Sequence, residues 1–490
     1  MRTSIYLTMA ASIFLFGCGS ADTGELVGVQ DRAPVYSNDP YGMVLVPQGS
    51  FVQGAGEEDI PWSLNAEAKT ISVSAFWMDD TEITNNEYRQ FVYWVRDSIA
   101  RLEIATKGNM DIEQTRMVFN ANEQDLREDP FNIKEEDLPL KWDYPIPWKG
   151  EDPQTYDAYK AVKEKLFYPN EERFTKYISR EEIDTRKLIY EYSWVDFRQA
   201  ARKYQLDGKV RRRNYSAEVL EADEYSGDKE TNVYNSKNLE ERYTNRKSFI
   251  LRNRILVYPD TLVWVGDFSY SYNEPQSNAY FSNPNFDEYP VVGVSWVQAT
   301  AFCIWRTNLM NSWLVSKGMS TVQDYKLPTE SEWEYAARGG LEQMMYPWGG
   351  YYPRDMQGCY LANFKGNRGD LTKDGGFYTT MVRTYSPNDF GLYDMAGNVS
   401  EWTRDAFDES AYSYTHDMNP SYEYNARRED PPVLKRKVVR GGSWKDIAFF
   451  LQNGTRTFEY QDTAKSYIGF RCVRAHMGAR AAISSKSNVY

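Results

Sequence analysis

Histidine is scarce in this chain: only His416 and His476 occur among 490 residues. A metal site built from three histidines is therefore excluded. A serine–histidine hydrolase would need one of these two, and neither lies in a recognisable catalytic motif. We interpret both as surface or packing residues. The cysteines show no CxxC spacing, which excludes a zinc site made of thiolates.

Long hydrophobic runs are also missing, because a membrane-spanning helix needs about 20 apolar residues and no segment provides them. The apolar run Ile5–Phe16 has instead the length of a signal-peptide core. It ends in Leu15-Phe16-Gly17-Cys18, which resembles a lipobox. We expect residues 1–17 to be a lipoprotein signal peptide, Cys18 to carry the lipid, and residues 18–40 to form a flexible tether. An ordinary secretory signal with an incidental cysteine is the alternative.

Positive charge is in deficit, since the net charge is −13. This argues against nucleic acid as a partner, and the short basic run at 209–213 is typical of a solvated face or a protein contact.

Besides Cys18, the chain has Cys303, Cys359 and Cys472. In an oxidising compartment one disulfide and one odd thiol are expected from this count.

Three segments carry strong helix-start signals, a capping box followed by apolar residues at helical spacing. The boxes are Thr84–Glu87, Ser295–Gln298 and Thr329–Glu332. Expected core positions in these helices are Tyr88, Phe91, Val92, Val95, Ile99, Ala299, Phe302, Cys303, Met310, Trp313, Trp333, Ala336 and Ala337. Gly318 and Gly339 are predicted to end the second and third helices.

Short, glycine-rich strand segments predict an α+β fold with sparse regular secondary structure. Examples are residues 43–54, 438–444 and 467–475. Residues from about 96 to 284 are instead rich in charge and tyrosine, and we interpret them as an insertion in one fold, with a separate domain as the alternative. Within it, residues 250–268 show strand-like patterning. Residues 479–490 are expected to be a polar tail.

The order of seven motifs identifies a family resemblance. They are MVLVPQGSF at 43–51, TEITNNEY at 81–88, PVVGVSW at 290–296, LPTESEWEYAARGG at 327–340, NDFGLYDMAGNVSEW at 388–402, RGGSW at 440–444 and IGFRC at 468–472. Together they resemble the formylglycine-generating-enzyme, or sulfatase-modifying-factor, family. The resemblance implies that family's fold over residues 41–478, apart from the insertion.

The resemblance also implies that catalysis is lost. In the family's enzymes two cysteines after the Gly-Gly-Ser-aromatic motif bind copper, because Cu(I) prefers soft sulfur ligands. The matching positions here are Asp446 and Leu451, and no cysteine lies between Trp444 and Phe470. Related iron-dependent sulfoxide synthases use three histidines, more than this chain has. We therefore expect no copper and no catalytic residue.

Structural features of the family match this chain more closely. Cys303 and Cys472 fall where the family has a disulfide, with two buried thiols as the alternative. Two calcium sites, structural in role, are implied at Asn363, Phe364, Asp374 and Gly376, and at Asp394, Gly397, Val399 and Glu401. Alternatively, Asp394 and Glu401 only hydrogen-bond the loop backbone. Trp77, Trp296, Trp333, Trp402 and Trp444 match core positions, although they could form an aromatic ligand cage.

One subfamily is most similar, the lipoproteins of gliding motility and type IX secretion. Tyr258–Leu262 and Tyr270–Pro275 strengthen the match. It implies a non-catalytic scaffold at the outer membrane, lipid-anchored and facing the periplasm, in a ring-like complex with a partner of the GldN or PorN type. The tyrosine- and arginine-rich insertion has the chemistry of an interface. The alternatives are an oxygen-dependent enzyme with a rewired site near Asp446 and a ligand-binding module that uses the degenerate cleft.

Overall fold

The structure is a computed structural model of the chain. It describes residues 36–37, 39–55, 68–108, 140–150, 155–169, 182–195, 205–206, 209–210, 250–268, 279–366, 372–426, 430–477 and 479–480. The predicted signal peptide, the lipidated Cys18, most of the tether, the 270–275 motif and the end of the tail lie outside these residues.

Three helices begin where the capping boxes predict them. They are α2 (Asn85–Lys107), α10 (Trp296–Ser316) and α11 (Glu330–Arg338), capped by Thr84, Ser295 and Thr329 through reciprocal hydrogen bonds. Gly339 ends α11 in the left-handed conformation with φ +60°, which glycine adopts without steric cost. One core prediction is wrong: Trp313 is 52% exposed, because it lies on the outer face of α10, while its neighbour Leu314 is buried.

Two four-stranded sheets form the centre of the fold. The first has the order β10-β15-β5-β2 and the second β13-β12-β11-β14, while β3 and β4 form a separate pair. Their bounds are β2 (Met43–Val46), β3 (Gly49–Gln53), β4 (Lys69–Val73), β5 (Phe76–Asp79), β10 (Tyr325–Lys326), β11 (Ser400–Ala406), β12 (Arg436–Arg440), β13 (Thr457–Tyr460), β14 (Ile468–Gly469) and β15 (Val473–Ala475). Motifs near both ends of the chain thus meet in one sheet, since β5 pairs with both β2 and β15.

The tryptophans of the family motifs lie in the core. Trp77, Trp333 and Trp402 are at most 1% exposed, and Trp296 and Trp444 are 8% exposed. The largest apolar cluster joins α2 and α10 through Tyr88, Phe91 and Phe302. The core interpretation of these tryptophans is therefore confirmed, and a solvent-facing cage is excluded.

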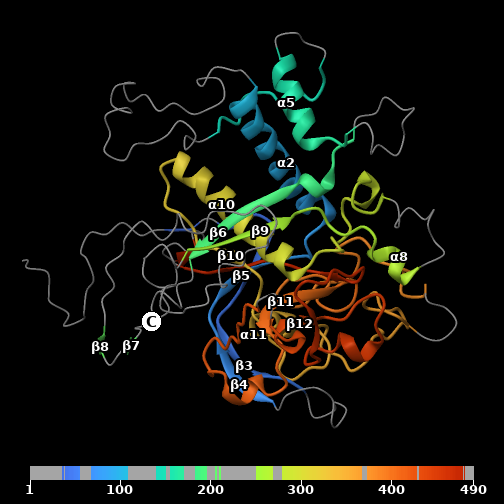
Figure 1. Cartoon of the computed structure of the whole chain (residues 1–490). Coiled ribbons are helices and arrows are strands. Elements are labelled where there is room, and N and C mark those ends of the chain that lie inside the picture. Colours follow the sequence, from blue (N-terminus) through green and yellow to red (C-terminus); the bar gives the residue numbers. More distant parts are fainter. Residues whose placement is uncertain are drawn as a thin grey trace, which may run out of the picture. The chain divides into compact units, whose positions relative to one another are not determined.

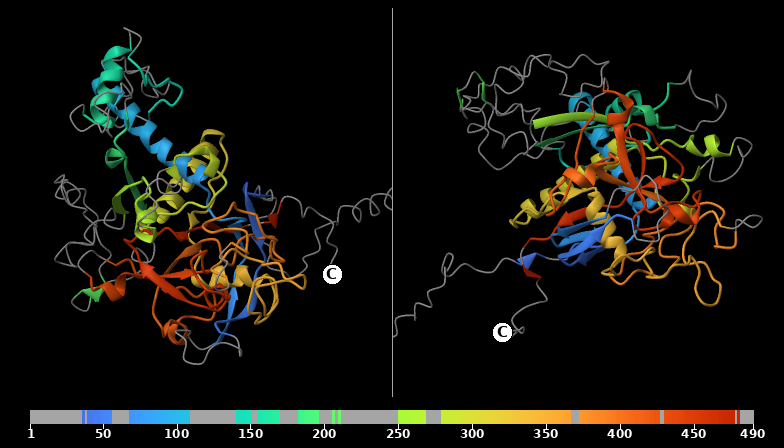
Figure 2. Two further views of the ribbon diagram at one scale, coloured as in Figure 1. Left: turned by 90° about the vertical axis from the view of Figure 1, so that its right-hand side faces the viewer. Right: turned by 90° about the horizontal axis from the view of Figure 1, so that it is seen from below.

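Elements of the predicted insertion pack against the same core. Helix α5 (Tyr156–Leu166) lies beside α2, and β6 (Ile189–Val195) pairs antiparallel with β9 (Ile250–Leu256) across α10 (Figures 1 and 2). A short pair, β7 (Gln205–Leu206) and β8 (Lys209–Val210), belongs to the same stretch of the sequence. The strand prediction for 250–268 is right only in its first half, because α8 (Val263–Asp267) follows β9.

Residues Pro40–His476 form one compact unit, completed by the short helix α12 (Ala411–Tyr414) and by 3-10 turns. The 3-10 turns are η2 (Thr185–Lys187), η6 (Pro284–Phe286), η7 (Pro432–Lys435) and η8 (Ala448–Leu451). In a second unit, β1 (Tyr36–Ser37) pairs in parallel with β16 (Ala479–Arg480). Of the helices in the described ranges, none is both long and apolar enough to cross a membrane.

Candidate functional site

Asp446 and Leu451, which the resemblance aligns with the copper ligands of the family's enzymes, follow β12 in a loop that begins with a tight turn. Gly442 has φ +67°, and a Cβ there would lie 2.8 Å from the Phe450 backbone. Beyond the turn, the Asp446 carboxylate accepts a 2.6 Å hydrogen bond from Ser443 Oγ, and burial raises the pKa of Asp446. Leu451 is 1% exposed in an apolar cluster with Phe364. The two positions thus hold a hydrogen-bonded carboxylate and a core side chain.

Helix α8 covers the aromatic residue of this turn. Trp264 and Phe268 both stack on the Trp444 ring, with centroids 5.9 Å and 5.8 Å away and planes 17° and 23° apart. Asp267 holds the end of α8 down through hydrogen bonds from Lys445 Nζ and Ser466 Oγ. The chain's own aromatic side chains therefore occupy the space beside Trp444.

The segment before α8 is docked just as closely. Asp260 N donates to Gly293 O at 2.8 Å, and Tyr88 Oη donates to Val257 O at 3.0 Å. Gly293 has φ +74°, and a Cβ there would lie 2.3 Å from Asp260 O. The glycine of the 290–296 motif is thus required for this contact, which the sequence analysis did not identify.

The first predicted calcium set lies in one loop region. Asp374 Oδ2 accepts from Phe364 N at 2.8 Å, and Asp374 Oδ1 faces Gly376 N at 3.5 Å. The side-chain oxygen of Asn363, a buried residue, has no hydrogen-bond partner, although its amide nitrogen donates to Tyr378 O at 2.8 Å. An unpaired buried oxygen costs free energy and fits a hard cation ligand.

The second set lies beside the first, since Asn398 N donates to Asn363 O at 2.8 Å. Asp394 Oδ1 is also buried without a hydrogen-bond partner, and burial raises the pKa of Asp394 to about 6. Glu401 differs from the expected ligand, because Arg471 donates to both of its oxygens at 2.8 Å and Trp333 Nε1 donates to one at 2.7 Å.

A further carboxylate, Glu82, belongs to this region and was missed. It accepts from Asn398 Nδ2 at 2.7 Å and from Val399 N at 3.0 Å. Burial, and then the charges of Asp394 and Glu401, raise the pKa of Glu82. Its place in the 81–88 motif was the available signal, but only the tertiary structure brings it to the 394–401 loop.

Metal ligands of the usual ionisable kinds do not converge in the described part of the chain. No three side chains of His, Cys, Asp or Glu surround a common point there. A cation at the two loops would therefore depend on amide and carbonyl oxygens in addition to the carboxylates, as calcium sites often do.

The predicted disulfide partners lie together. The Sγ atoms of Cys303 and Cys472 are 3.4 Å apart, and both residues are buried as thiols. Burial raises the pKa of the Cys472 thiol. The disulfide itself stays a prediction.

The remaining cysteine and the two histidines are placed as follows. Cys359 and His416 are exposed. His476 packs edge-on against Trp77, with ring centroids 5.9 Å apart.

The α+β fold and the turn at Gly441–Trp444 define a domain built on the plan of the sulfatase-modifying factors. The chain belongs to this family: the model of the sulfatase-modifying factor enzyme 1-like domain matches residues 30–139 and 202–476. The unmatched residues 140–201 lie within the predicted insertion.

Relatives of this chain include a protein named as inactive and a protein named as an enzyme. The chain is 35% identical over 191 residues to inactive C-alpha-formylglycine-generating enzyme 2 of Bos taurus, covering 38% of this chain and 50% of that protein. It is 32% identical over 196 residues to the formylglycine-generating enzyme of Bos taurus, covering 39% and 45%. The chain thus spans about half the length of these curated relatives. Among solved structures, PvdO from Pseudomonas aeruginosa aligns with TM-score 0.41 and 15% identity, over 91% of this chain and 100% of that chain.

Proposed function

We propose that this protein is a non-catalytic structural lipoprotein of the type IX secretion and gliding-motility machinery, of the GldK or PorK type. In this proposal Cys18 carries the lipid anchor at the outer membrane. The folded unit faces the periplasm and assembles with a GldN- or PorN-type partner into a large ring-like complex. The seven family motifs and the subfamily resemblance of residues 258–262 motivate this choice.

The proposal that the protein is non-catalytic rests mainly on the side chains of the loop after β12. Leu451 is buried among apolar side chains, Asp446 is hydrogen-bonded to Ser443, and α8 stacks on Trp444. A carboxylate and an aliphatic side chain do not provide the soft ligands that Cu(I) requires. The existence of relatives called inactive supports the same conclusion.

Measurements of metal content and oxygen consumption test whether the protein is non-catalytic. The purified chain is expected to hold copper and iron far below one equivalent after exposure to either metal. It is also expected to consume no dioxygen with a thiol-bearing peptide substrate. A formylglycine-generating enzyme assayed in parallel is the positive control. Stoichiometric copper or iron together with oxygen uptake would overturn the non-catalytic assignment.

A partly exposed aromatic and arginine cluster, formed by α2 and the segment 140–150, supports a scaffold role. Trp94 stacks on Trp142 with centroids 5.3 Å apart, and the Arg101 guanidinium lies 5.0 Å from the Trp142 ring centroid. Trp142 is 37% exposed. Tyrosine, tryptophan and arginine are enriched at the energetic centres of protein interfaces, so this cluster is our candidate partner contact.

The complex can be tested in detergent extracts of native membranes. Wild type is expected to migrate as a very large assembly that contains the partner. Trp142→Ala is expected to shift much of the protein to small species, while Tyr352→Ala, at a residue 75% exposed elsewhere, is not. Circular dichroism checks that both variants fold. A wild-type chain that is extracted alone contradicts the scaffold function.

We also propose that calcium binds at the two predicted loops. The unpartnered buried oxygens of Asn363 and Asp394 support this proposal. So does the excess of acidic groups, since Glu401, Glu82 and Asp394 all interact electrostatically with the single buried Arg471. When bound, the ion would screen these carboxylates and bridge the loops. Its role would be structural.

A further inference from the structure

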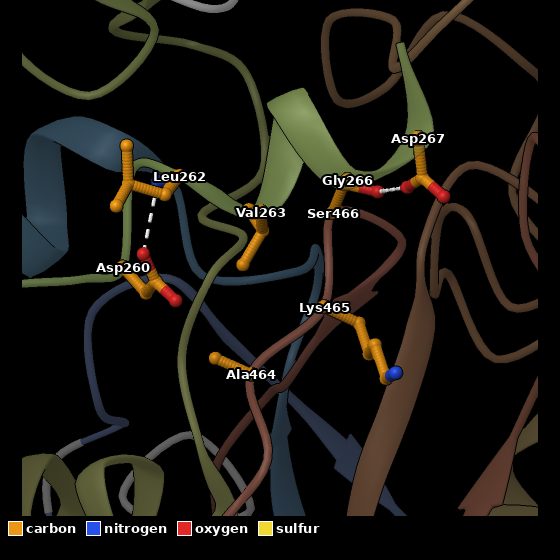
Figure 3. A pocket seen from close by; sticks show the side chains of 8 residues that line it. All are labelled: Asp260, Leu262, Val263, Gly266, Asp267, Ala464, Lys465 and Ser466. Atoms are coloured by element: carbon orange, nitrogen blue, oxygen red, sulfur yellow. Dashed lines mark hydrogen bonds between the residues drawn. The ribbon is translucent and has the colours of Figure 1, made fainter. Parts of the chain in front are cut away.

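A pocket of about 310 Å³ lies between α8 and the loop before β14 (Figure 3). Leu262, Val263 and Ala464 form its apolar walls, and Asp260, Asp267 and Lys465 add charged groups. Its volume is at the lower end of the range for ligand pockets, which suits a single side chain. Neither predicted calcium set lines it.

Two of the three charged groups are engaged with other residues. Asp267 accepts hydrogen bonds from Lys445 and Ser466. Lys465 Nζ lies 3.8 Å from Glu459 Oε2, and its side chain points away from Asp260 (Figure 3). Neither group is therefore the main anchor for a ligand in this pocket.

Asp260 is placed differently. One carboxylate oxygen accepts from Leu262 N at 2.9 Å, which fixes the side chain, and the carboxylate faces the hollow between Val263 and Ala464 (Figure 3). An oriented carboxylate beside aliphatic walls is complementary to an alkyl chain that ends in a cation, because the stem buries apolar surface and the charge pairs with the carboxylate.

We propose that this pocket binds a lysine or arginine side chain presented by a partner protein. The partner part rests on the proposed scaffold function. The methylene stem lies against Leu262, Val263 and Ala464, and the terminal cation pairs with Asp260. Because an exposed ion pair contributes little to affinity, an isolated side-chain analogue is expected to bind only weakly.

Saturation-transfer NMR on the full folded chain tests the pocket with Nα-acetyl-lysine amide and its uncharged analogue Nα-acetyl-norleucine amide. The lysine amide is expected to saturate the signal and the norleucine amide to bind up to about five-fold more weakly. Asp260→Asn keeps an oxygen for Leu262 N but is expected to abolish this preference. Asp417→Asn, at an exposed carboxylate elsewhere, is the matched control.

Equal binding of the two probes, or an unchanged preference for the lysine amide in Asp260→Asn, overturns the pocket assignment. The scaffold function is still supported in that case if the membrane complex persists. The same variant tests the source of the cation. Loss of probe preference with a smaller membrane complex supports a partner side chain. Loss of probe preference with an intact complex overturns the partner as the source.

Discussion

Trp264 lies flat on Trp444, with ring centroids 5.9 Å apart and planes at 17°. One ring comes from the predicted insertion and the other from the glycine-rich motif at 440–444. The insertion therefore contributes a core contact beside the Gly441–Trp444 turn.

Trp264→Ala is expected to destabilise the protein by about 3–5 kcal/mol. The Trp264 side chain is only 2% exposed, so its truncation leaves a large cavity in the core. Urea unfolding followed by far-UV circular dichroism measures the loss. Trp313→Ala, at a side chain 52% exposed, should change stability by less than about 1 kcal/mol. Similar losses in both variants would mean that α8 is not packed on Trp444.

Lys437 is expected to make the stability depend on pH. Its side chain is fully buried, donates to Tyr424 O at 2.7 Å and lies 3.8 Å from the Trp296 ring centroid. Burial lowers the pKa of Lys437 to about 7, whereas in the unfolded chain it is about 10.4. Between these values the unfolded state binds the extra proton, so stability should rise with pH.

The difference between wild type and Lys437→Met isolates this effect. The free energy of unfolding of wild type should increase, relative to the variant, by up to about 1.4 kcal/mol per pH unit above pH 7. Urea titrations at several pH values up to 9.5 measure it. Lys317→Met, at an exposed position, should run parallel to wild type. A constant difference between wild type and Lys437→Met would show that Lys437 does not titrate in this range.

Calcium is expected to raise the unfolding temperature, because binding to the native state alone stabilises it by about 2.7 kcal/mol at a hundred-fold excess over the dissociation constant. Asn363→Ala should remove the contribution of the first loop and Asp394→Asn that of the second. The measurement is the calcium-dependent shift in calorimetry, with magnesium as the control ion. An identical response to both ions, or none, contradicts specific calcium sites.

Cys303 and Cys472 are expected to form a disulfide in the exported protein, given sulfur atoms 3.4 Å apart. Alkylation in denaturant without reductant should then label Cys359 but neither of these two, and mass spectrometry reads the result. Reduction should lower stability by up to about 5 kcal/mol, because the bond closes a long loop. Labelling of all three residues without reductant would support the alternative of two buried thiols.

Local signals were sufficient for much of the secondary structure. The three helix starts follow from capping boxes whose hydrogen bonds join residues three apart, so the chain's local order specifies them. The end of the strand prediction at 250–268 was wrong because a short apolar run does not distinguish a strand from a buried helical turn. Residues Val263–Asp267 form a helical turn, and Trp264 in this turn and Phe268 at its end both stack on Trp444.

By itself the sequence determined the family, the α+β class, the buried tryptophans and the absence of soft ligands at 446 and 451, since these depend on residue identity and local spacing. Tertiary structure alone decided that Glu82 joins the 394–401 loop, that Arg471 engages Glu401, and that α8 covers Trp444 beside the Asp260 pocket. Each of these contacts joins residues about 70 to more than 300 positions apart. Packing of the whole fold places such residues together, and no local pattern encodes that placement.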